Sequence, residues 1–202
     1  NFIARLGWGH GNDETFTTSQ LIELFDFGNV GKTNGVWNPE KLIALNQHWL
    51  KTSDPQDVAR ELVPFLHAVG APEAKADARL TREVKAFAAR AKTLVDMAQA
   101  IKPYYTHGVT IDGGAAAKHL DAAGKDMLKR ASDHLLRVSE WTQANLDPVV
   151  ETIANEIGAK KGAIAQPIRV AVKGNTTSPG IGDTLELLGR EEALHRIGAA
   201  LK

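Results

Sequence analysis

The chain has 202 residues, of which 43% are hydrophobic and 24% are charged, a composition that supports a folded core and excludes a disordered or collagen-like chain. Its 24 Lys and Arg residues balance 24 Asp and Glu residues, so no overall charge steers it toward DNA, RNA or an anionic membrane. The absence of cysteine excludes disulfides, thiolate metal sites and a cysteine nucleophile.

The sequence contains no candidate membrane-spanning or secretory segment. No apolar run reaches the ~20 residues that cross a bilayer, and no basic stretch precedes a long apolar one at the N-terminus. We therefore expect a cytoplasmic protein. Because the chain begins at Asn1 rather than Met, on an apolar stretch, we also expect a piece of a longer protein. Its length suits two domains of about 100 residues each.

The first clear helix signal follows a loop. Residues 28–39 (GNVGKTNGVWNP) are rich in turn-forming residues and expose Lys32, which predicts an irregular segment. Asn38 can then cap the free amide groups of a helix, and Pro39 suits a first helical position. We expect this helix over residues 40–50.

A second helix is predicted over residues 53–69. Ser53 or Asp54 can cap it, Pro55 suits its first turn, and Gly70 suits its end. One apolar face forms along it through spacings of three and four residues: Val58, Leu62, Phe65, Leu66 and Val69.

Helical periodicity continues through the middle of the chain. We expect one long helix over residues 81–102, a further helix over 125–142, and another that begins at Asp147 and Pro148 and ends near Gly158. No alternation of strands and helices is visible, so a parallel sheet is not expected. The expected fold class is all-α.

The segment 168–173 (IRVAVK) admits two interpretations. Its apolar residues alternate as in a strand, but Pro167 before it and Gly174 after it favour a short helix. In either case Arg169 is a lone charge in an apolar segment.

The sequence shows no recognisable active site. The seven histidines form no HExxH pair and no cluster with carboxylates at metal-ligand spacing. The glycines in residues 174–182 match neither a phosphate-binding loop nor a dinucleotide fingerprint, and no GxSxG elbow occurs.

Several stretches together resemble the anticodon-binding end of bacterial glutamyl-tRNA synthetases. The strongest are KGAIAQPIRVAVKG at 161–174, TSPGI at 177–181 and LELLGREE at 185–192. Further similar stretches extend over the rest of the chain: NFIARLGWGHG at 1–11, ELF at 23–25, WNPEKL at 37–42, LN at 45–46 and AKTLVDMA at 91–98.

This resemblance implies the later part of a stem-contact domain over residues 1–50 and a helical anticodon-binding region of two subdomains, 51–124 and 125–202. In that family a separate domain with HIGH-like and KMSKS-like motifs uses ATP and Mg²⁺, and neither motif occurs in this sequence. The chain alone is therefore expected to hold no cofactor or metal and to bind tRNA(Glu) as a monomer without acylating it, with no DNA or membrane partner.

The same resemblance assigns an anticodon contact to Arg169, beside a turn against which a base packs. That turn contains Thr177, Ser178, Pro179 and Ile181. An unstacked base offers its edge to a guanidinium and its face to apolar side chains. The alternatives are a salt bridge at the edge of the core for Arg169, and helix capping for Thr177 and Ser178.

Arg90 matches a family position linked to the third anticodon base and to rejection of the glutamine tRNA. Its alternative is an ordinary solvated helix face. Contacts to the tRNA backbone are expected from five lysines: Lys32, Lys41, Lys160, Lys161 and Lys173.

Two other functions remain open at this point. The chain can be a helical scaffold that binds a protein through its amphipathic faces, or a free-standing tRNA-binding paralogue without a catalytic domain. The first predicts association that is insensitive to salt, whereas contacts to phosphates are salt-sensitive.

Overall fold

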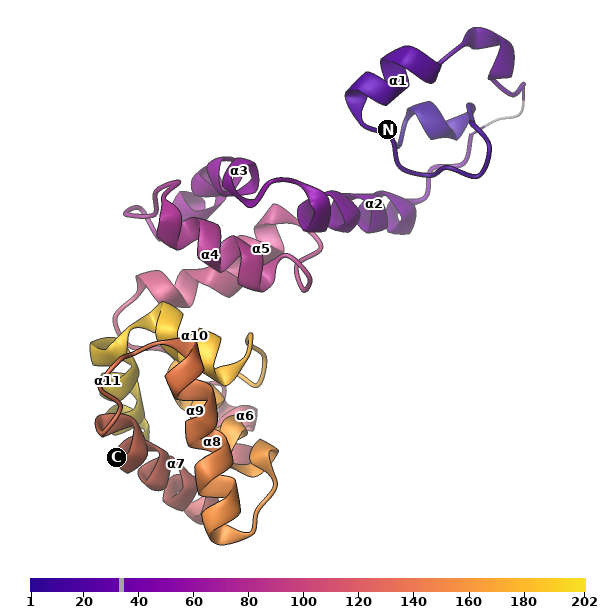
Figure 1. The fold of residues 1–202 in the computed structure, drawn as a ribbon. Coiled ribbons are helices and arrows are strands. Elements are labelled where there is room, and N and C mark those ends of the chain that lie inside the picture. Colours follow the sequence, from indigo (N-terminus) through magenta and orange to yellow (C-terminus); the bar gives the residue numbers. More distant parts are fainter. Residues whose placement is uncertain (33–34) are drawn as a thin grey trace.

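The computed structural model describes residues 1–32 and 35–202, and these residues form helices without any β-strand. The expected all-α class is confirmed. Figure 1 shows an elongated molecule in which three units follow one another from the N-terminus to the C-terminus. Thr33 and Asn34, in the predicted loop, lie outside the described residues.

The N-terminal unit (residues 1–37) is built around an aromatic cluster. Trp8 is buried and packs against Phe16 and Phe25, with ring centroids 5.3 and 5.6 Å apart. A single antiparallel bridge joins Trp8 to Val30. Because so little of the unit is helical, its aromatic side chains supply most of its packing. Its helical segments are η1 (Ala4–Leu6), α1 (Thr18–Leu24) and η2 (Phe27–Asn29).

The first helical unit (residues 39–105) begins with a helix that connects it to the N-terminal unit (Figure 1). Both predicted helix starts are confirmed: Asn38 Oδ1 accepts the Lys41 amide at 3.1 Å, and Asp54 Oδ1 accepts the Gln56 amide at 2.7 Å. The segments of this unit are α2 (Pro39–Thr52), α3 (Pro55–Ala68), α4 (Ala78–Phe87), α5 (Leu94–Ile101) and η3 (Lys102–Tyr105).

The prediction of one long helix over residues 81–102 is wrong. The chain turns between α4 and α5, and the Phe87 carbonyl accepts the amides of both Arg90 and Ala91. Thr93 then caps α5 by accepting the Asp96 amide at 3.0 Å. A threonine three residues before an acid is a helix-start signal, and the apolar periodicity concealed it.

The second helical unit (residues 113–202) surrounds α9. This helix packs against α7, α8 and α11, and Gly174 ends it with φ = 77°, as predicted. The Gly174 carbonyl accepts the Asp112 amide at 2.8 Å, which brings α6 onto α9. The helices of this unit are α6 (Gly113–His119), α7 (Ala122–Leu136), α8 (Gln143–Ile157), α9 (Lys161–Lys173), α10 (Ile181–Leu188) and α11 (Arg190–Leu201).

Two prolines expected to open helices instead lie inside them. Pro148 is within α8, and Pro167 is within α9, so both helices start earlier than predicted. A proline leaves the carbonyl four residues earlier without a helical partner. Those residues are Ala144 and Ala163, and both are exposed, so water can satisfy the carbonyl groups.

The predicted helix over residues 125–142 is displaced toward the N-terminus. The observed α7 spans 122–136 because Asp121 accepts the Gly124 amide at 2.8 Å and so starts the helix earlier. The chain then leaves the helix before Trp141, whose indole donates to the Leu185 carbonyl at 2.8 Å.

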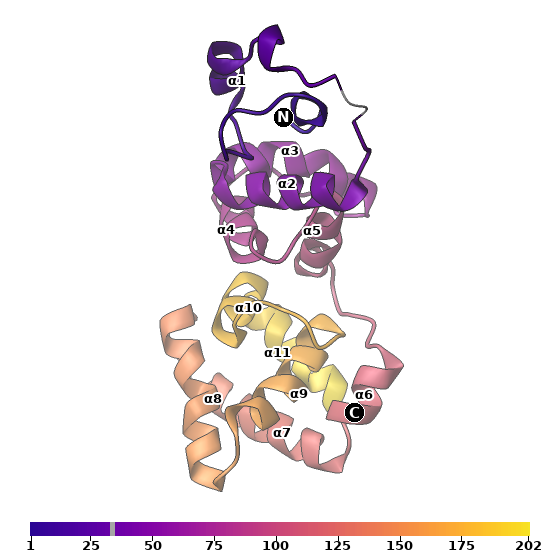
Figure 2. The same cartoon turned by 90° about the vertical axis from the view of Figure 1, so that its right-hand side faces the viewer.

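A connecting segment (residues 106–112) links the two helical units, and Figure 2 shows the second unit beyond α4 and α5, with α10 and α11 nearest to them. Arg82 on α4 pairs with Glu186 on α10 at 3.1 Å. No helix among the described residues has the length and apolar character needed to cross a membrane.

Candidate nucleic-acid interface

Two arginines from different helical units meet at Ser178. Arg90 lies in the turn between α4 and α5, and its Nη1 donates to the Ser178 carbonyl oxygen at 2.8 Å. Arg169 lies in α9, and its Nε donates to the Ser178 hydroxyl at 2.8 Å. The side chain of Arg169 therefore lies beside the 178–181 turn, as expected. We call Arg90 and Arg169 the arginine pair.

The turn that carries Ser178 is held by its own hydrogen bonds. Ser178 Oγ donates to the Pro179 carbonyl at 2.9 Å and lies 3.0 Å from Thr184 Oγ1, which is fully buried on α10. The Thr177 amide donates to Asn175 Oδ1 at 2.9 Å. These contacts fix the acceptor atoms toward which the arginine pair is directed.

The arginine pair is positively charged and only partly satisfied. Arg90 is exposed and Arg169 is half-buried. Burial lowers the pKa of Arg169 and the neighbouring charge of Arg90 lowers it further, but an arginine remains protonated because its pKa begins so high. Across the described residues, the ion pairs include no carboxylate partner for either arginine.

This arrangement suits an anion or a nucleobase edge. Each guanidinium carries several N–H donors in a fixed fork, and the contacts above use one nitrogen of each. The other N–H groups of each guanidinium are suited to acceptor oxygens and ring nitrogens of a ligand. The positive charge of the guanidinium strengthens such hydrogen bonds.

The remaining residues predicted in the turn differ in exposure. Pro179 and Ile181 are buried, and Ile181 belongs to the hydrophobic core. Thr177 and Gly180 are exposed. Thr177 and Gly180 therefore form the exposed side of the turn, and Pro179 and Ile181 lie on its buried side.

The structure corrects the prediction for Lys173, which cannot contact the tRNA backbone. Its side chain is buried, and Nζ donates to the Ala100 carbonyl at 2.7 Å. The ammonium lies 4.0 Å from the centre of the Tyr104 ring, a cation–π contact. Burial lowers the pKa of Lys173 to about 7, and the charge of Arg196 acts in the same direction.

The other predicted lysines are exposed but lie in separate places. Lys160 precedes α9, and Lys161 Nζ is 2.8 Å from Glu151 on α8. Lys32 belongs to the N-terminal unit and Lys41 to the first turn of α2. Figure 1 shows the N-terminal unit at the opposite end of the molecule from the unit that contains α9. Their contacts with tRNA stay predictions.

A cavity of about 520 Å³ opens between the N-terminal unit and α2. Its lining includes Arg5, Glu14, Lys41 and His48 together with other polar and apolar side chains. Among residues 1–32 and 35–202, no group of three or more His, Asp or Glu side chains could hold a metal ion.

Sequence reasoning missed Thr184 and Arg196. Thr184 supports Ser178, and Arg196 is a buried cation on α11. Glu192 precedes Arg196 by one helical turn, and each is followed directly by an apolar residue, Ala193 and Ile197. That spacing on an apolar face was the available signal for a buried ion pair.

Comparison with known proteins identifies a family for most of the chain. Residues 57–201 match a family described as "Anticodon binding domain". The chain is 48% identical over 202 residues to a glutamate–tRNA ligase of Myxococcus xanthus. The matched region covers 100% of this chain and 42% of that protein. A glutamate–tRNA ligase of Syntrophobacter fumaroxidans is 38% identical and covered to 43%. The chain thus spans less than half the length of these relatives.

Solved structures share the same fold. A glutamate tRNA ligase from Elizabethkingia meningosepticum, in complex with its amino acid, superimposes with a TM-score of 0.87 over 98% of this chain and 39% of that chain, at 20% identity. A glutamate-tRNA synthetase from Elizabethkingia anophelis gives a TM-score of 0.83 at 21% identity, again over 98% of this chain and 39% of that chain.

Proposed function

Because the chain belongs to the anticodon-binding domain family, we propose that it recognises the anticodon of tRNA(Glu) as part of a glutamate–tRNA ligase. The observation that supports this most directly is the arginine pair at Ser178. It joins two helical units at one turn and retains donors without carboxylate partners in the described structure.

The physical chemistry of anticodon recognition fits such a pair. Bases of an anticodon loop can be unstacked and displayed singly, so their Watson–Crick edges are open to a guanidinium. In this proposal Arg169 contacts one base at the outer side of the turn, and Arg90 contacts the third anticodon base and disfavours the glutamine tRNA. Each good base contact contributes about 1–3 kcal/mol of discrimination.

Phosphate contacts add affinity without sequence preference. In this proposal Lys160 and Lys161, near the start of α9, supply them on the side of the anticodon stem. Lys32 and Lys41 contact the tRNA farther from the anticodon. With 24 basic and 24 acidic residues, the affinity rests on such local contacts and falls with salt.

The activity of the whole protein belongs to the same proposal. Attachment of glutamate to tRNA would use ATP and Mg²⁺ in a catalytic domain, while this chain, as a monomer, binds tRNA and acylates nothing. The relatives named above support the ligase class, and a cytoplasmic location follows from that role.

A filter-binding titration tests the proposal. The chain is titrated with tRNA(Glu) and with the same tRNA carrying a scrambled anticodon, each at two salt concentrations. We expect tighter binding of tRNA(Glu) at both and weaker binding of both tRNAs at the higher salt. Equal binding of the two tRNAs excludes anticodon recognition. Absence of salt-sensitive binding favours a protein-binding scaffold.

A further inference from the structure

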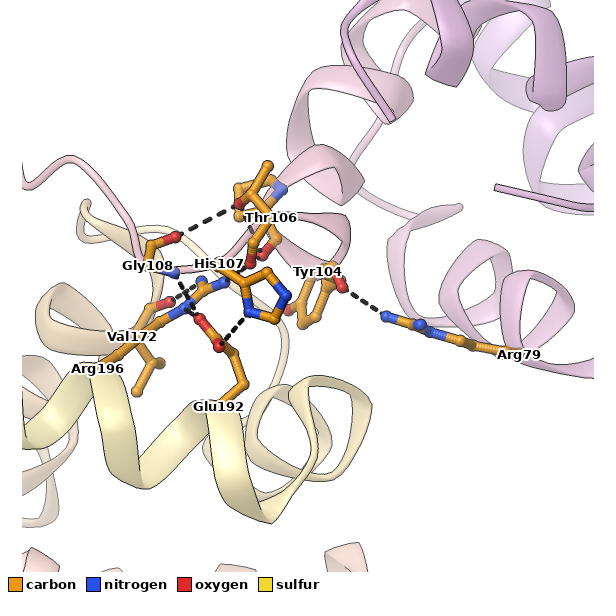
Figure 3. Close-up of polar contacts among 9 residues, drawn as sticks. Arg79, Tyr104, Thr106, His107, Gly108, Val172, Glu192 and Arg196 are labelled. Atoms are coloured by element: carbon orange, nitrogen blue, oxygen red, sulfur yellow. Dashed lines mark hydrogen bonds and ion pairs between the residues drawn. The ribbon is translucent and has the colours of Figure 1, made fainter. Parts of the chain in front are cut away.

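Arg196 lies at the boundary between the two helical units, and one nitrogen of its guanidinium reaches across it. Its side chain is fully buried on α11. Nη2 donates to the carbonyls of Pro103, at 2.8 Å, and Thr106, at 2.5 Å, and Nη1 donates to the Val172 carbonyl at 2.7 Å. Figure 3 shows this fork between α11 and the chain that leaves the first helical unit.

Glu192, one turn earlier on α11, completes the arrangement. Its Oε1 accepts Arg196 Nε at 2.6 Å and the Gly108 amide at 2.7 Å. His107 Nδ1 lies 3.3 Å from its Oε2 (Figure 3). The ion pair therefore holds the Pro103 carbonyl, at the end of the first helical unit, and the Thr106 carbonyl and Gly108 amide of the connecting segment. We call this set of contacts the joint.

Helix ends explain why cations gather there. The last carbonyls of a helix have no helical partner and carry the negative end of its dipole. At the end of α5 and η3, Lys173 donates to the Ala100 carbonyl, and Arg79 donates to the Tyr104 carbonyl (Figure 3). Arg79 belongs to the first unit, whereas Lys173 and Arg196 belong to the second.

Few other polar contacts fix the angle between the units. Arg82 and Glu186 form a pair across the boundary, with side chains 57% and 28% exposed, and such surface pairs contribute little. The bond from Arg90 to Ser178 also crosses it, but Arg90 is exposed and is the group proposed to bind RNA. The bond from Lys173 to the Ala100 carbonyl crosses the boundary as well and is buried, so the joint and this bond are the buried polar connections among the described residues.

We infer that Arg196, together with Glu192, is a positioning residue that fixes the orientation of the two helical units and thereby brings Arg90 and Arg169 to the same turn. Arg196 itself hydrogen-bonds neither arginine and does not bind tRNA. The effect on binding rests on the function proposed above, whereas the effect on orientation does not.

The cysteine-free sequence permits a direct test. Glu61 on α3 and Lys129 on α7 are exposed residues of different units. Spin labels are attached to the two cysteines of a Glu61→Cys/Lys129→Cys double variant. Double electron–electron resonance then gives the distribution of distances between the labels. Arg196→Met is compared in this background with Arg190→Met. Arg190 also donates to two carbonyls, of Leu136 and Val138, but both lie within the second unit.

We expect Arg196→Met to widen the distance distribution at least twofold and to lower the preference for tRNA(Glu) over the scrambled tRNA about tenfold, the loss of one base contact. Arg190→Met should change neither. Glu192→Ala leaves Arg196 in place but removes the acceptor of the Gly108 amide. It should widen the distribution to a smaller extent, and it carries the test if Arg196→Met does not fold by circular dichroism.

An unchanged distribution in a folded Arg196→Met or Glu192→Ala protein overturns the inference. A widened distribution with undiminished discrimination overturns the link to the arginine pair. If the parent chain itself does not distinguish the two tRNAs, the proposed function fails while the distance measurement still decides whether Arg196 sets the orientation.

Discussion

The joint and the arginine pair are built from the same chemical group, but they use it differently. At the joint, all three nitrogens of the Arg196 guanidinium donate inside the protein, and the side chain is buried. At Ser178, each of Arg90 and Arg169 donates from one nitrogen, and both side chains reach solvent at least in part. Only the joint contains a carboxylate partner within the described residues.

This difference separates a structural cation from a recognition cation. A buried guanidinium whose donors are all used has no donor left for a ligand. Its removal leaves the buried acceptors that it bonded without hydrogen-bond partners. A partly satisfied guanidinium at the surface costs less to remove and retains donors for a base or phosphate. Substitutions in the joint should therefore act mainly on stability, and substitutions in the arginine pair mainly on recognition.

The largest effect is expected at the joint. Arg196→Met should lower the free energy of unfolding by about 3 kcal/mol, because it leaves Glu192 and three buried or half-buried carbonyl groups without their partner. Urea unfolding followed by circular dichroism measures it. The control, Arg190→Met, should cost clearly less, since Leu136 is exposed and Val138 half-buried, so water can replace the arginine. Equal losses in the two variants would remove the distinction.

The arginine pair should show the opposite profile. Arg169→Ala should lower the preference for tRNA(Glu) over altered anticodons roughly ten- to a hundredfold, while the free energy of unfolding falls by less than about 1 kcal/mol. Ser178 keeps Thr184 and Pro179 as partners, so the turn should persist. Filter binding and urea unfolding provide the two measurements.

The whole enzyme offers a control for Arg169. ATP-dependent activation of glutamate by the full-length ligase should be nearly unchanged in Arg169→Ala, because the proposed contact is to the anticodon alone. If mutant and wild type charge tRNAs with altered anticodons equally well, Arg169 does not select the anticodon.

Local signals made part of this structure predictable. The caps at Asn38 and Asp54 and the end at Gly174 depend on residues adjacent in the sequence, so their hydrogen bonds could be inferred. The positions of Pro148 and Pro167 inside α8 and α9 could not be predicted in this way. A helix tolerates an internal proline where the carbonyl four residues earlier reaches water. That exposure is decided by packing between helices.

The candidate site was predictable only by residue type. The segment 168–173 identified Arg169 as a lone charge, and the family resemblance indicated Arg90, but their meeting at Ser178 depends on how two helical units dock. Lys173 illustrates the same limit. It ends the apolar segment as a surface lysine would, yet docking of α5 buries it against Ala100 and Tyr104.

Lys173, buried at the same boundary as the joint, gives a prediction for pH. The pKa of Lys173 is lowered from 10.5 to about 7 on folding, so between these values the unfolded chain binds a proton that the folded chain does not. Stability from this group is full above pH 10.5 and is lost as the pH falls to 7. The free energy of unfolding should therefore rise by about 2 kcal/mol between pH 7 and pH 9.

Lys173→Met should remove this rise. Urea unfolding at pH 7, 8 and 9 measures it. The range stops at pH 9 because burial raises the pKa of the buried Tyr104 and of the half-buried Tyr105, so their ionisation favours unfolding at higher pH. Lys85→Met, which removes an exposed lysine of α4, serves as the control and should retain the rise. A rise that persists in Lys173→Met would assign it to another group.

The smallest effect is expected at the surface lysines, and it extends the comparison to adjacent residues. Lys161 is already paired with Glu151, whereas the described structure contains no ion pair for Lys160. Lys160→Gln should weaken cognate and scrambled tRNA equally and reduce the slope of log affinity against log salt by about 1. Lys161→Gln should change that slope less, because Glu151 already offsets part of its charge. A larger change in Lys161→Gln would mean that tRNA displaces Glu151, and loss of discrimination in Lys160→Gln would mean that Lys160 contacts a base.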